Sequence, residues 1–395
     1  MPTEANARRG QIDRLQPAGA LVVVVLAVYA VFLVLVLHGY GFNPSALIGL
    51  GSDNPFTDPS ALPDNLIIFD SDGYDGQHFY HIALSLVRGE RPAVPPVRVQ
   101  RVVYPLAAAL LSLGQERALP YTLIAANLLA VAIGTAIFIR LLRRHNLSPW
   151  WSLLFALNPG MILEVQMDLA LPMTMAFAAG AWLCWEKRRL WAASALLALA
   201  LLTRESAVLF VIPIVAAEAM AKRLRGAAIL SLSVVPFLAW QIILRVWLGA
   251  GGMAASAGQF GIPGAGMIAA LGNAAGSVGE GFAALARQGS VVAVMALVVA
   301  ALVVSVWKMR KGYDAYTGGV FIHAAFALFA AIDIWVAYAS AGRVFAGIFP
   351  LLVLSYGIRR DRPTLLLLVA TALLALFTLL RPFVISPDVA FIITG

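Results

Sequence analysis

Eleven apolar runs, separated by short polar segments, dominate the chain. Most contain about 17–22 residues, the length that an α-helix needs to cross the hydrocarbon core of a bilayer. We therefore predict an all-α polytopic membrane protein with about 11 transmembrane helices, forming one domain over residues 18–381. The predicted spans are residues 18–38, 120–140, 149–165, 169–185, 190–203, 206–220, 227–248, 290–307, 318–338, 343–358 and 363–381.

Two stretches depart from this simple pattern. Residues 104–114 are apolar but too short to span, so we predict a helix that dips into the outer leaflet. The spans at 190–203 and 206–220 are also short, and Arg204 and Glu205 lie between them. One continuous helix would bury this charged pair in the middle of the membrane, which is costly. Two helices that turn at the outer face avoid that cost.

Composition supports a membrane protein, and the distribution of charge gives its orientation. The chain is 61% hydrophobic and 12% charged, against about 25% charged residues in soluble proteins. Cytoplasmic loops of membrane proteins attract Lys and Arg, and six basic clusters alternate correctly with the eleven spans. These clusters are Arg8/Arg9/Arg14, Arg140/Arg143/Arg144, Lys187/Arg188/Arg189, Lys222/Arg223/Arg225, Lys308/Arg310/Lys311 and Arg359/Arg360/Arg362.

This map predicts a multi-pass protein of the cytoplasmic (inner) membrane. Residues 1–17 form a cytoplasmic tail, and residues 382–395 form an extracytoplasmic one. Residues 39–119 form a large outer loop, and the Gly/Ala-rich residues 249–289 form a second, which covers a groove or guides a substrate. Because the basic residues mark topology, the net charge of +8 does not indicate binding to nucleic acid.

The remaining polar residues gather on the predicted outer face, although they are scattered along the sequence. Polar groups in or near a membrane are costly and usually functional. They are Asp70, Asp72, Asp75, Gln77, His78, His81, Arg98, Gln100 and Arg101 in the first loop, then Glu164, Asp168, Arg204, Glu205, Asp333 and Arg343.

A helix is predicted over residues 77–88. Its apolar residues recur at helical spacing, and a polar stripe lies opposite them, so we expect an amphipathic helix on the membrane surface. Asp75 stands at the start of this helix, where its carboxylate could accept a proton from a hydroxyl group. Aspartate is also a favoured N-cap, so capping the helix is the alternative role of Asp75.

Structural alternatives exist for other members of the set. Asp70 and Asp72 could only shape a turn. His78 and His81 could ligate a metal, but interfacial hydrogen bonding fits their spacing better, and a divalent cation is possible but not required. Arg204 and Glu205 could form a local ion pair, and Arg343 could be an ordinary interfacial arginine. The single cysteine excludes a cysteine-based metal site.

Several segments resemble those of the GT-C superfamily of integral membrane glycosyltransferases, including its mannosyltransferase and PIG-V-like members. "YDGQHFYHIA" (74–83) resembles the acidic first-loop motif, and "QRVVYPLAAALL" (100–111) resembles the re-entrant segment that follows it. "LNPGMILEVQMDLALP" (157–172) and "LALLTRESAVLF" (199–210) resemble outer-face turns, and "GRVFAGIFPLLVL" (342–354) resembles a late helix that contains arginine. The resemblance covers residues 18 to about 358.

The resemblance implies a polyprenyl-phosphate-sugar donor and an inverting transfer on the extracytoplasmic face, without a nucleotide. A first-loop carboxylate would be the base, with Asp75 the best match, Asp72 the second and Asp70 the third. Arg343, with Arg204 or Arg101, would hold the donor phosphate. Substrate binding falls to Gln77, His78, His81, Tyr104, Asp168 and Glu205. The acceptor would be a glycan, lipid or protein, and membrane lipids would surround the protein.

A transporter or lipid flippase is the alternative class. Transporters place charged residues near the middle of the membrane and often contain internal repeats of broken helices. In this sequence the charges fall at the ends of the predicted helices, and no such repeat is visible. The pattern therefore favours the transferase.

Overall fold

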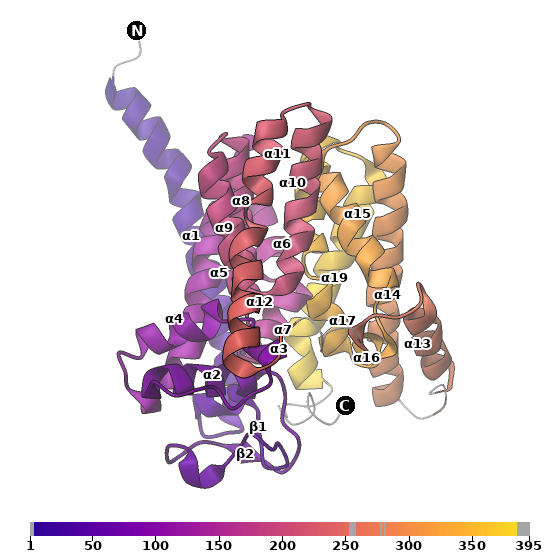
Figure 1. Cartoon of the computed structure of the whole chain (residues 1–395). Coiled ribbons are helices and arrows are strands. Elements are labelled where there is room, and N and C mark those ends of the chain that lie inside the picture. Colours follow the sequence, from indigo (N-terminus) through magenta and orange to yellow (C-terminus); the bar gives the residue numbers. More distant parts are fainter. Residues whose placement is uncertain (1–3, 253–257, 277–278, 280–281, 385–395) are drawn as a thin grey trace.

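The computed structural model describes residues 4–252, 258–276, 279 and 282–384 (Figure 1). Parts of the predicted tails (1–17 and 382–395) and of the Gly/Ala-rich loop (249–289) lie outside these residues. The first half of the chain contains helices α1 (Glu4–His38), α2 (Gly76–Arg88), α3 (Pro96–Val99), α4 (Val103–Leu111), α5 (Leu119–Arg144), α6 (Leu153–Ala156), α7 (Pro159–Gln166), α8 (Leu171–Glu186), α9 (Leu190–Thr203), α10 (Val208–Met220), α11 (Leu224–Ser231) and α12 (Val234–Leu248). The second half contains α13 (Ala265–Gly276), α14 (Phe282–Met309), α15 (Ala315–Leu328), α16 (Ile332–Trp335), α17 (Tyr338–Val344), α18 (Ile348–Ile358) and α19 (Arg362–Val384).

The remaining regular structure is short. The 3₁₀ turns are η1 (Pro44–Ile48), η2 (Pro59–Ala61), η3 (Glu116–Ala118), η4 (Pro149–Ser152) and η5 (Glu205–Ala207). Strands β1 (Leu50–Gly51) and β2 (Ile68–Phe69) form a two-residue parallel pair, with Leu50 opposite Ile68. The structure is thus an all-α fold, as predicted.

Helix length and composition support a multi-pass membrane protein. Within the described ranges, five helical segments are long and apolar enough to cross a bilayer: 18–38, 116–144, 224–248, 286–309 and 362–383. A sixth results if the bent pair α17–α18 is counted as one span. The other predicted spans correspond to shorter or interrupted helices, so eleven crossings remain a prediction.

Two predicted spans are interrupted for reasons that the coordinates make clear. Residues 149–165 divide into η4, α6 and α7, because Pro159 lacks an N–H and the side chain of Asn158 caps a new helix by accepting from Met161 N at 3.1 Å. The span 318–338 ends early, at Leu328. Its last carbonyls accept instead from Gly261 and Gly264, in the segment before α13.

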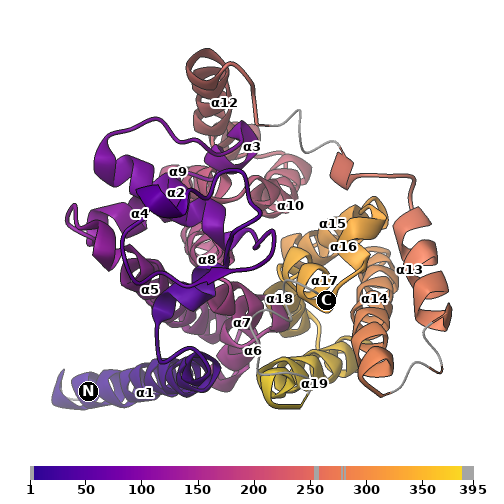
Figure 2. The same ribbon diagram turned by 90° about the horizontal axis from the view of Figure 1, so that it is seen from below.

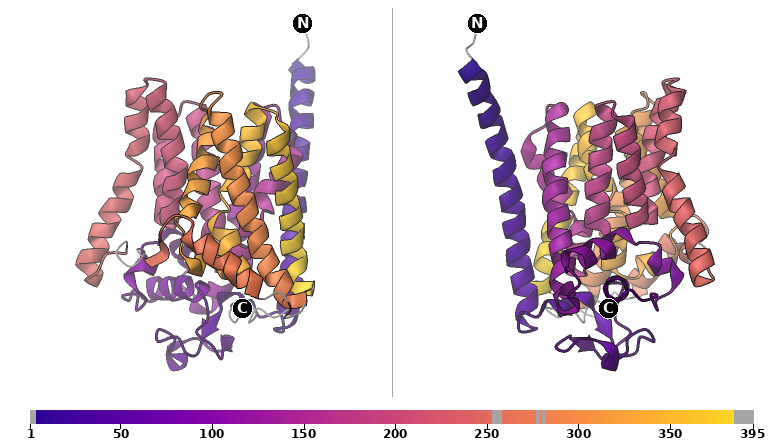
Figure 3. Two further views of the ribbon diagram at one scale, coloured as in Figure 1. Left: turned by 90° about the vertical axis from the view of Figure 1, so that its right-hand side faces the viewer. Right: turned by 60° about the vertical axis from the view of Figure 1, so that its left-hand side comes forward.

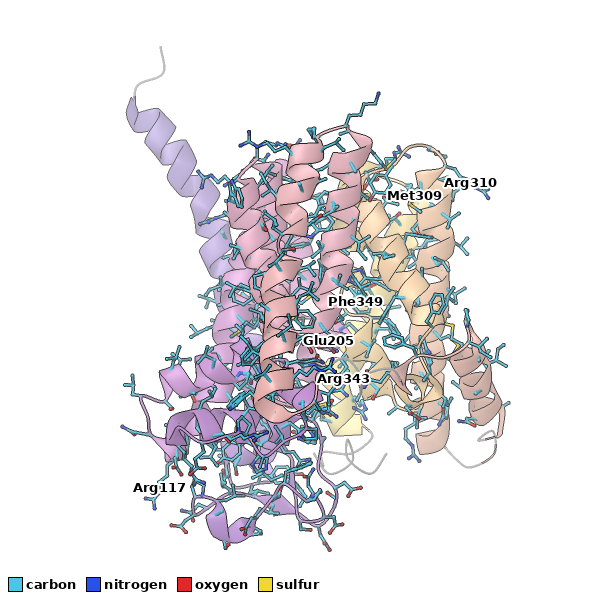
Figure 4. The ribbon with its side chains drawn as sticks, viewed as in Figure 1. Arg117, Glu205, Met309, Arg310, Arg343 and Phe349 are labelled. Atoms are coloured by element: carbon cyan, nitrogen blue, oxygen red, sulfur yellow. The ribbon has the colours of Figure 1, made fainter. Side chains whose placement is uncertain are left out.

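The helices form a bundle that separates two ends of the molecule (Figures 1 and 3). The first residues of α1 and the α10–α11 turn lie at one end, which we call the basic end, and Arg310 belongs to it. Arg188 and Arg223 also belong to it, because both pair with Glu218 in the last turn of α10. Residues 39–118 cover the opposite end, which we call the loop end. Figure 4 shows Arg310 and Arg117 at these two ends. This separation agrees with the charge pattern, while the side of the membrane that each end faces remains a prediction.

The helix predicted over 77–88 is present as α2, but its surroundings differ from the expectation. Both of its faces pack against protein, because Gln77 and His81 of the polar stripe are buried together with Phe79, Ile82 and Ala83. The ring of Phe79 contacts that of Tyr104 on α4. Helix α2 is therefore largely buried within the protein at the loop end, and its position on the membrane surface stays a prediction.

Candidate functional site

A polar cavity of about 230 Å³ opens at the loop end. It lies between the α2–α3 region and the α16–α17 region, which come from the two halves of the chain that lie side by side in Figure 2. Four arginines and three acids line it: Arg98, Arg101, Arg204 and Arg343, with Asp75, Glu164 and Asp333. Residues that are distant in the sequence therefore meet in one place, as the topology predicted.

The local structure at the start of α2 sets the position of Asp75. A Cβ atom at Gly76 would lie 2.5 Å from the carbonyl oxygen of Met167 and 2.6 Å from that of Ile48. Only glycine permits this close approach of the helix to the bundle. Gly73, with φ of +68°, makes the turn just before it. The two Asp-Gly steps of the sequence thus bring Asp75 to the cavity.

Asp75 forms two ion pairs and no helix cap. Its Oδ1 lies 2.8 Å from Arg98 Nη1, and its Oδ2 lies 3.1 Å from Arg343 Nη2. Its side chain accepts no hydrogen bond from the first turn of α2, so the alternative role as an N-cap is wrong. Burial alone would raise the pKa of this carboxyl, but the attraction of Arg343 and Arg98 outweighs it and holds the pKa well below its usual range.

The other two predicted phosphate-binding arginines form ion pairs across the site. Arg101 donates from Nε to Glu205 Oε2 at 2.9 Å and makes a second bond to Oε1. Arg204 Nη1 donates to Glu164 Oε1 at 2.7 Å. The neighbours Arg204 and Glu205 therefore pair with separate partners, and the alternative of a local ion pair between them is wrong. Figure 4 shows Glu205 and Arg343 in the lower half of the bundle.

The second and third candidates for the base, Asp72 and Asp70, lie outside the cavity. Asp70 and Asp72 are exposed, and neither lines the cavity. Asp70 accepts from Ser52 Oγ at 3.4 Å, and the backbone carbonyl of Asp72 accepts from Gln77 Nε2 at 2.9 Å. Their contacts belong to the loop around β2, as in the turn alternative, so the structure does not bring them to the site.

Three predicted substrate-binding residues have structural contacts instead. Gln77 is buried. Its Oε1 accepts from the backbone N–H of Gly51 at 3.2 Å, and its Nε2 donates to the backbone carbonyl of Asp72. Tyr104 is fully buried, where its hydroxyl donates to Leu123 O and accepts from Asn127 Nδ2 at 2.8 Å. His81 lies 3.4 Å from Thr57 Oγ1. None of these three side chains lines the cavity.

His78 and Asp168 are close to the site in sequence but do not line the cavity. His78 packs against Phe56, and its buried Nδ1 has no partner among the described residues. Asp168 is fully buried with φ of +48°, and neither carboxylate oxygen has a hydrogen-bond partner in the described part of the chain. Burial lowers the pKa of His78 and of His81 to about 4.

A metal centre is not formed by the described side chains. Within residues 4–252, 258–276, 279 and 282–384, no three His, Cys, Asp or Glu side chains come together as possible ligands. His78 and His81 do not converge with a third ligand. The possible divalent cation therefore stays a prediction without a site.

Gln259 and Ser340 line the cavity although the sequence did not single them out, and Arg98, which was named only among the outer-face polar residues, lines it too. A signal existed for Arg98, because it precedes Arg101 by three residues and so falls on the same side of a helical turn. Gln259 and Ser340 carried no signal of this kind. Gln259 reaches the site through the segment that forms hydrogen bonds with Phe329 and Ala331, whereas Ser340 lies on α17 with Arg343.

An apolar groove of about 440 Å³ lies on the bundle. Side chains of α4, α5, α8 and α9 line it, including Ala107, Leu110, Ala130, Phe177 and Leu196. Helix α4 connects the two sites, because Arg101 immediately precedes it and Ala107 lies in it. The groove follows α5 from Ala126 to Ile137, about 17 Å at the helical rise per residue.

Comparisons with known proteins give no assignment. A scan against protein-family models and searches among curated proteins and solved structures find no match to this chain. Function must be inferred from the site.

Proposed function

We propose that this chain is an integral membrane glycosyltransferase. It would transfer a sugar from a polyprenyl-phosphate donor to an acceptor hydroxyl on the extracytoplasmic face, with inversion at the anomeric carbon. One observation carries the proposal: Asp75 and Arg343, from opposite halves of the chain, form an ion pair at the wall of a cavity that three further arginines line. A carboxylate among guanidinium groups is the pairing that this reaction needs.

In the proposed reaction, Asp75 takes the proton of the acceptor hydroxyl. The hydroxyl oxygen forms a bond to the anomeric carbon as the bond from that carbon to the donor phosphate breaks. The leaving phosphate carries the negative charge, and guanidinium groups match the geometry of its oxygens. Because the arginines are already in place within the protein, their stabilisation of this charge requires little reorganisation.

The apolar groove supports a lipid-linked substrate. A polyprenyl chain is wholly apolar, and side chains of four helices form a groove of the same character. With the phosphate at Arg98, Arg101 or Arg343, the chain would pass along α4 into this groove. The rest of the tail would extend into the bilayer.

The central test is Asp75→Asn in isolated membranes supplied with radiolabelled polyprenyl-phosphate sugars. Loss of a general base reduces the rate by about 10²–10⁴-fold, so we expect label transfer to fall to background. Asp64→Asn is the matched control, since Asp64 forms an ion pair with Arg117 in which both side chains are about 80% exposed. Normal transfer by a stably inserted Asp75→Asn protein would remove Asp75 as the base. Solute uptake without transfer would favour the transporter.

A further inference from the structure

The pair Arg98 and Arg343 already binds an anion, which is the side chain of Asp75. Each carboxylate oxygen contacts a different arginine, at 2.8 and 3.1 Å. The three side chains are 17–27% exposed, and all of them line the cavity. An anion that enters the cavity can therefore reach the same two guanidinium groups.

Few other contacts hold this carboxylate in place. It does not cap α2, and the two arginines are the only ion-pair partners of Asp75 among the described residues. The arginine pair can also donate a further hydrogen bond. Arg343 Nε is buried without a hydrogen-bond partner in the described part of the chain, and a larger oxyanion could accept from it.

We infer that Arg98 and Arg343 form a binding site for a phosphate oxyanion, and that Asp75 is the resident anion which this phosphate displaces. The choice of a phosphate rests on the proposed function, whereas the displaceable carboxylate rests on the ion pairs alone. Arg98 thereby becomes a phosphate-binding residue beside Arg343. A phosphate offers more acceptor oxygens than a carboxylate, so it can satisfy both arginines together with Arg343 Nε.

Displacement would also prepare the base. While Asp75 is held between two guanidinium groups, its pKa lies well below the usual range and it accepts protons poorly. When the phosphate neutralises the arginines, Asp75 is released and becomes more basic. The base would then be competent only when a donor is bound, which places donor binding before deprotonation of the acceptor.

The test measures binding rather than turnover. The purified full-length chain in detergent is titrated with farnesyl phosphate, a short prenyl monophosphate, and in parallel with inorganic phosphate. Asp75→Asn should bind farnesyl phosphate about tenfold more tightly than the unaltered chain, because the competing charge is gone while both arginines remain. Arg98→Ala should bind it about tenfold more weakly.

The controls separate this inference from misfolding and from the proposed function. Asp64→Asn removes a carboxylate from an exposed Asp–Arg pair and should leave the affinity unchanged. Unchanged or weaker binding by an Asp75→Asn protein with a normal thermal midpoint would overturn the inference, even if transfer activity were established. Tighter binding would support it even if no transfer were found. A gain for both probes indicates a site open to free phosphate, and a gain for farnesyl phosphate alone indicates a lipid-linked ligand.

Discussion

The two ends of the bundle both contain buried charges, but they use them differently. At the basic end, Glu218 is fully buried and accepts from Trp185, Arg188 and Arg223. Lys308 at the same end is 1% exposed and donates to Ser355 O and Asp361 Oδ2, both at 2.9 Å. These groups have their full complement of partners, and their contacts join neighbouring helices.

At the loop end the charges are less completely satisfied. Asp75 and its two arginines border a cavity, and Arg343 Nε has no hydrogen-bond partner in the described part of the chain. Buried polar groups in native proteins are normally hydrogen-bonded, so exceptions mark strain or a missing ligand. The buried charges Glu218 and Lys308 at the basic end hold neighbouring helices together, whereas those of Asp75 and its arginines border a cavity.

Of the substitutions considered, the removal of Arg343 should have the largest effect on sugar transfer. We expect Arg343→Ala to reduce sugar transfer about 100-fold or more, because it removes a cation that stabilises the leaving phosphate. The free energy of unfolding should change by only about 1 kcal/mol, since Asp75 keeps Arg98 and some contact with water. Transfer assays and thermal unfolding in detergent measure the two effects, with the exposed Arg117→Ala as the control. A large loss of stability at normal specific activity would contradict the division between the two ends.

Removing Lys308 should give the opposite result. Lys308→Met keeps the approximate size of the side chain but leaves Asp361 without its buried cation. Breaking a buried pair in this way costs about 3–5 kcal/mol, so we expect a lower thermal midpoint with near-normal transfer per folded molecule. Lys311→Met is the matched control, because Lys311 is exposed and its ammonium group lies over the ring of Trp307. Equal midpoints for the two variants would show that the buried network does not stabilise the bundle.

The sequence predicted which residues share an end, but not how they pair. Charge alternation placed Arg101, Arg204 and Glu205 at one end, and the break between α9 and α10 occurs at Arg204, as predicted. The ion pairs Arg101–Glu205 and Arg204–Glu164 depend on the orientation of the η5 turn relative to α7. The pattern of apolar residues does not specify this orientation. The early end of α15 similarly depends on hydrogen bonds from residues distant in the chain. Local pattern therefore gave the elements, and tertiary contacts decided the site.

Acidification should weaken the loop end through two buried histidines. Burial lowers the pKa of His78 and His81 to about 4 from the usual 6.5; for His78 the charges of Arg98 and Arg101 lower it further, and that of Asp75 raises it. Between these values the unfolded chain binds protons that the folded chain does not, so stability is complete above about pH 6.5 and declines as the pH falls toward 4. The slope is at most about 1.4 kcal/mol per pH unit for each histidine. The Asp75 carboxylate does not contribute in this window, since its pKa is lowered and its stabilisation is lost only at lower pH.

Thermal midpoints in detergent from pH 7 to pH 4.5 measure the decline in stability. The double variant His78→Asn, His81→Asn should show a shallower decline. An identical decline in that variant would show that His78 and His81 of α2 do not cause the loss of stability at low pH. Acid sensitivity would then not distinguish the two ends.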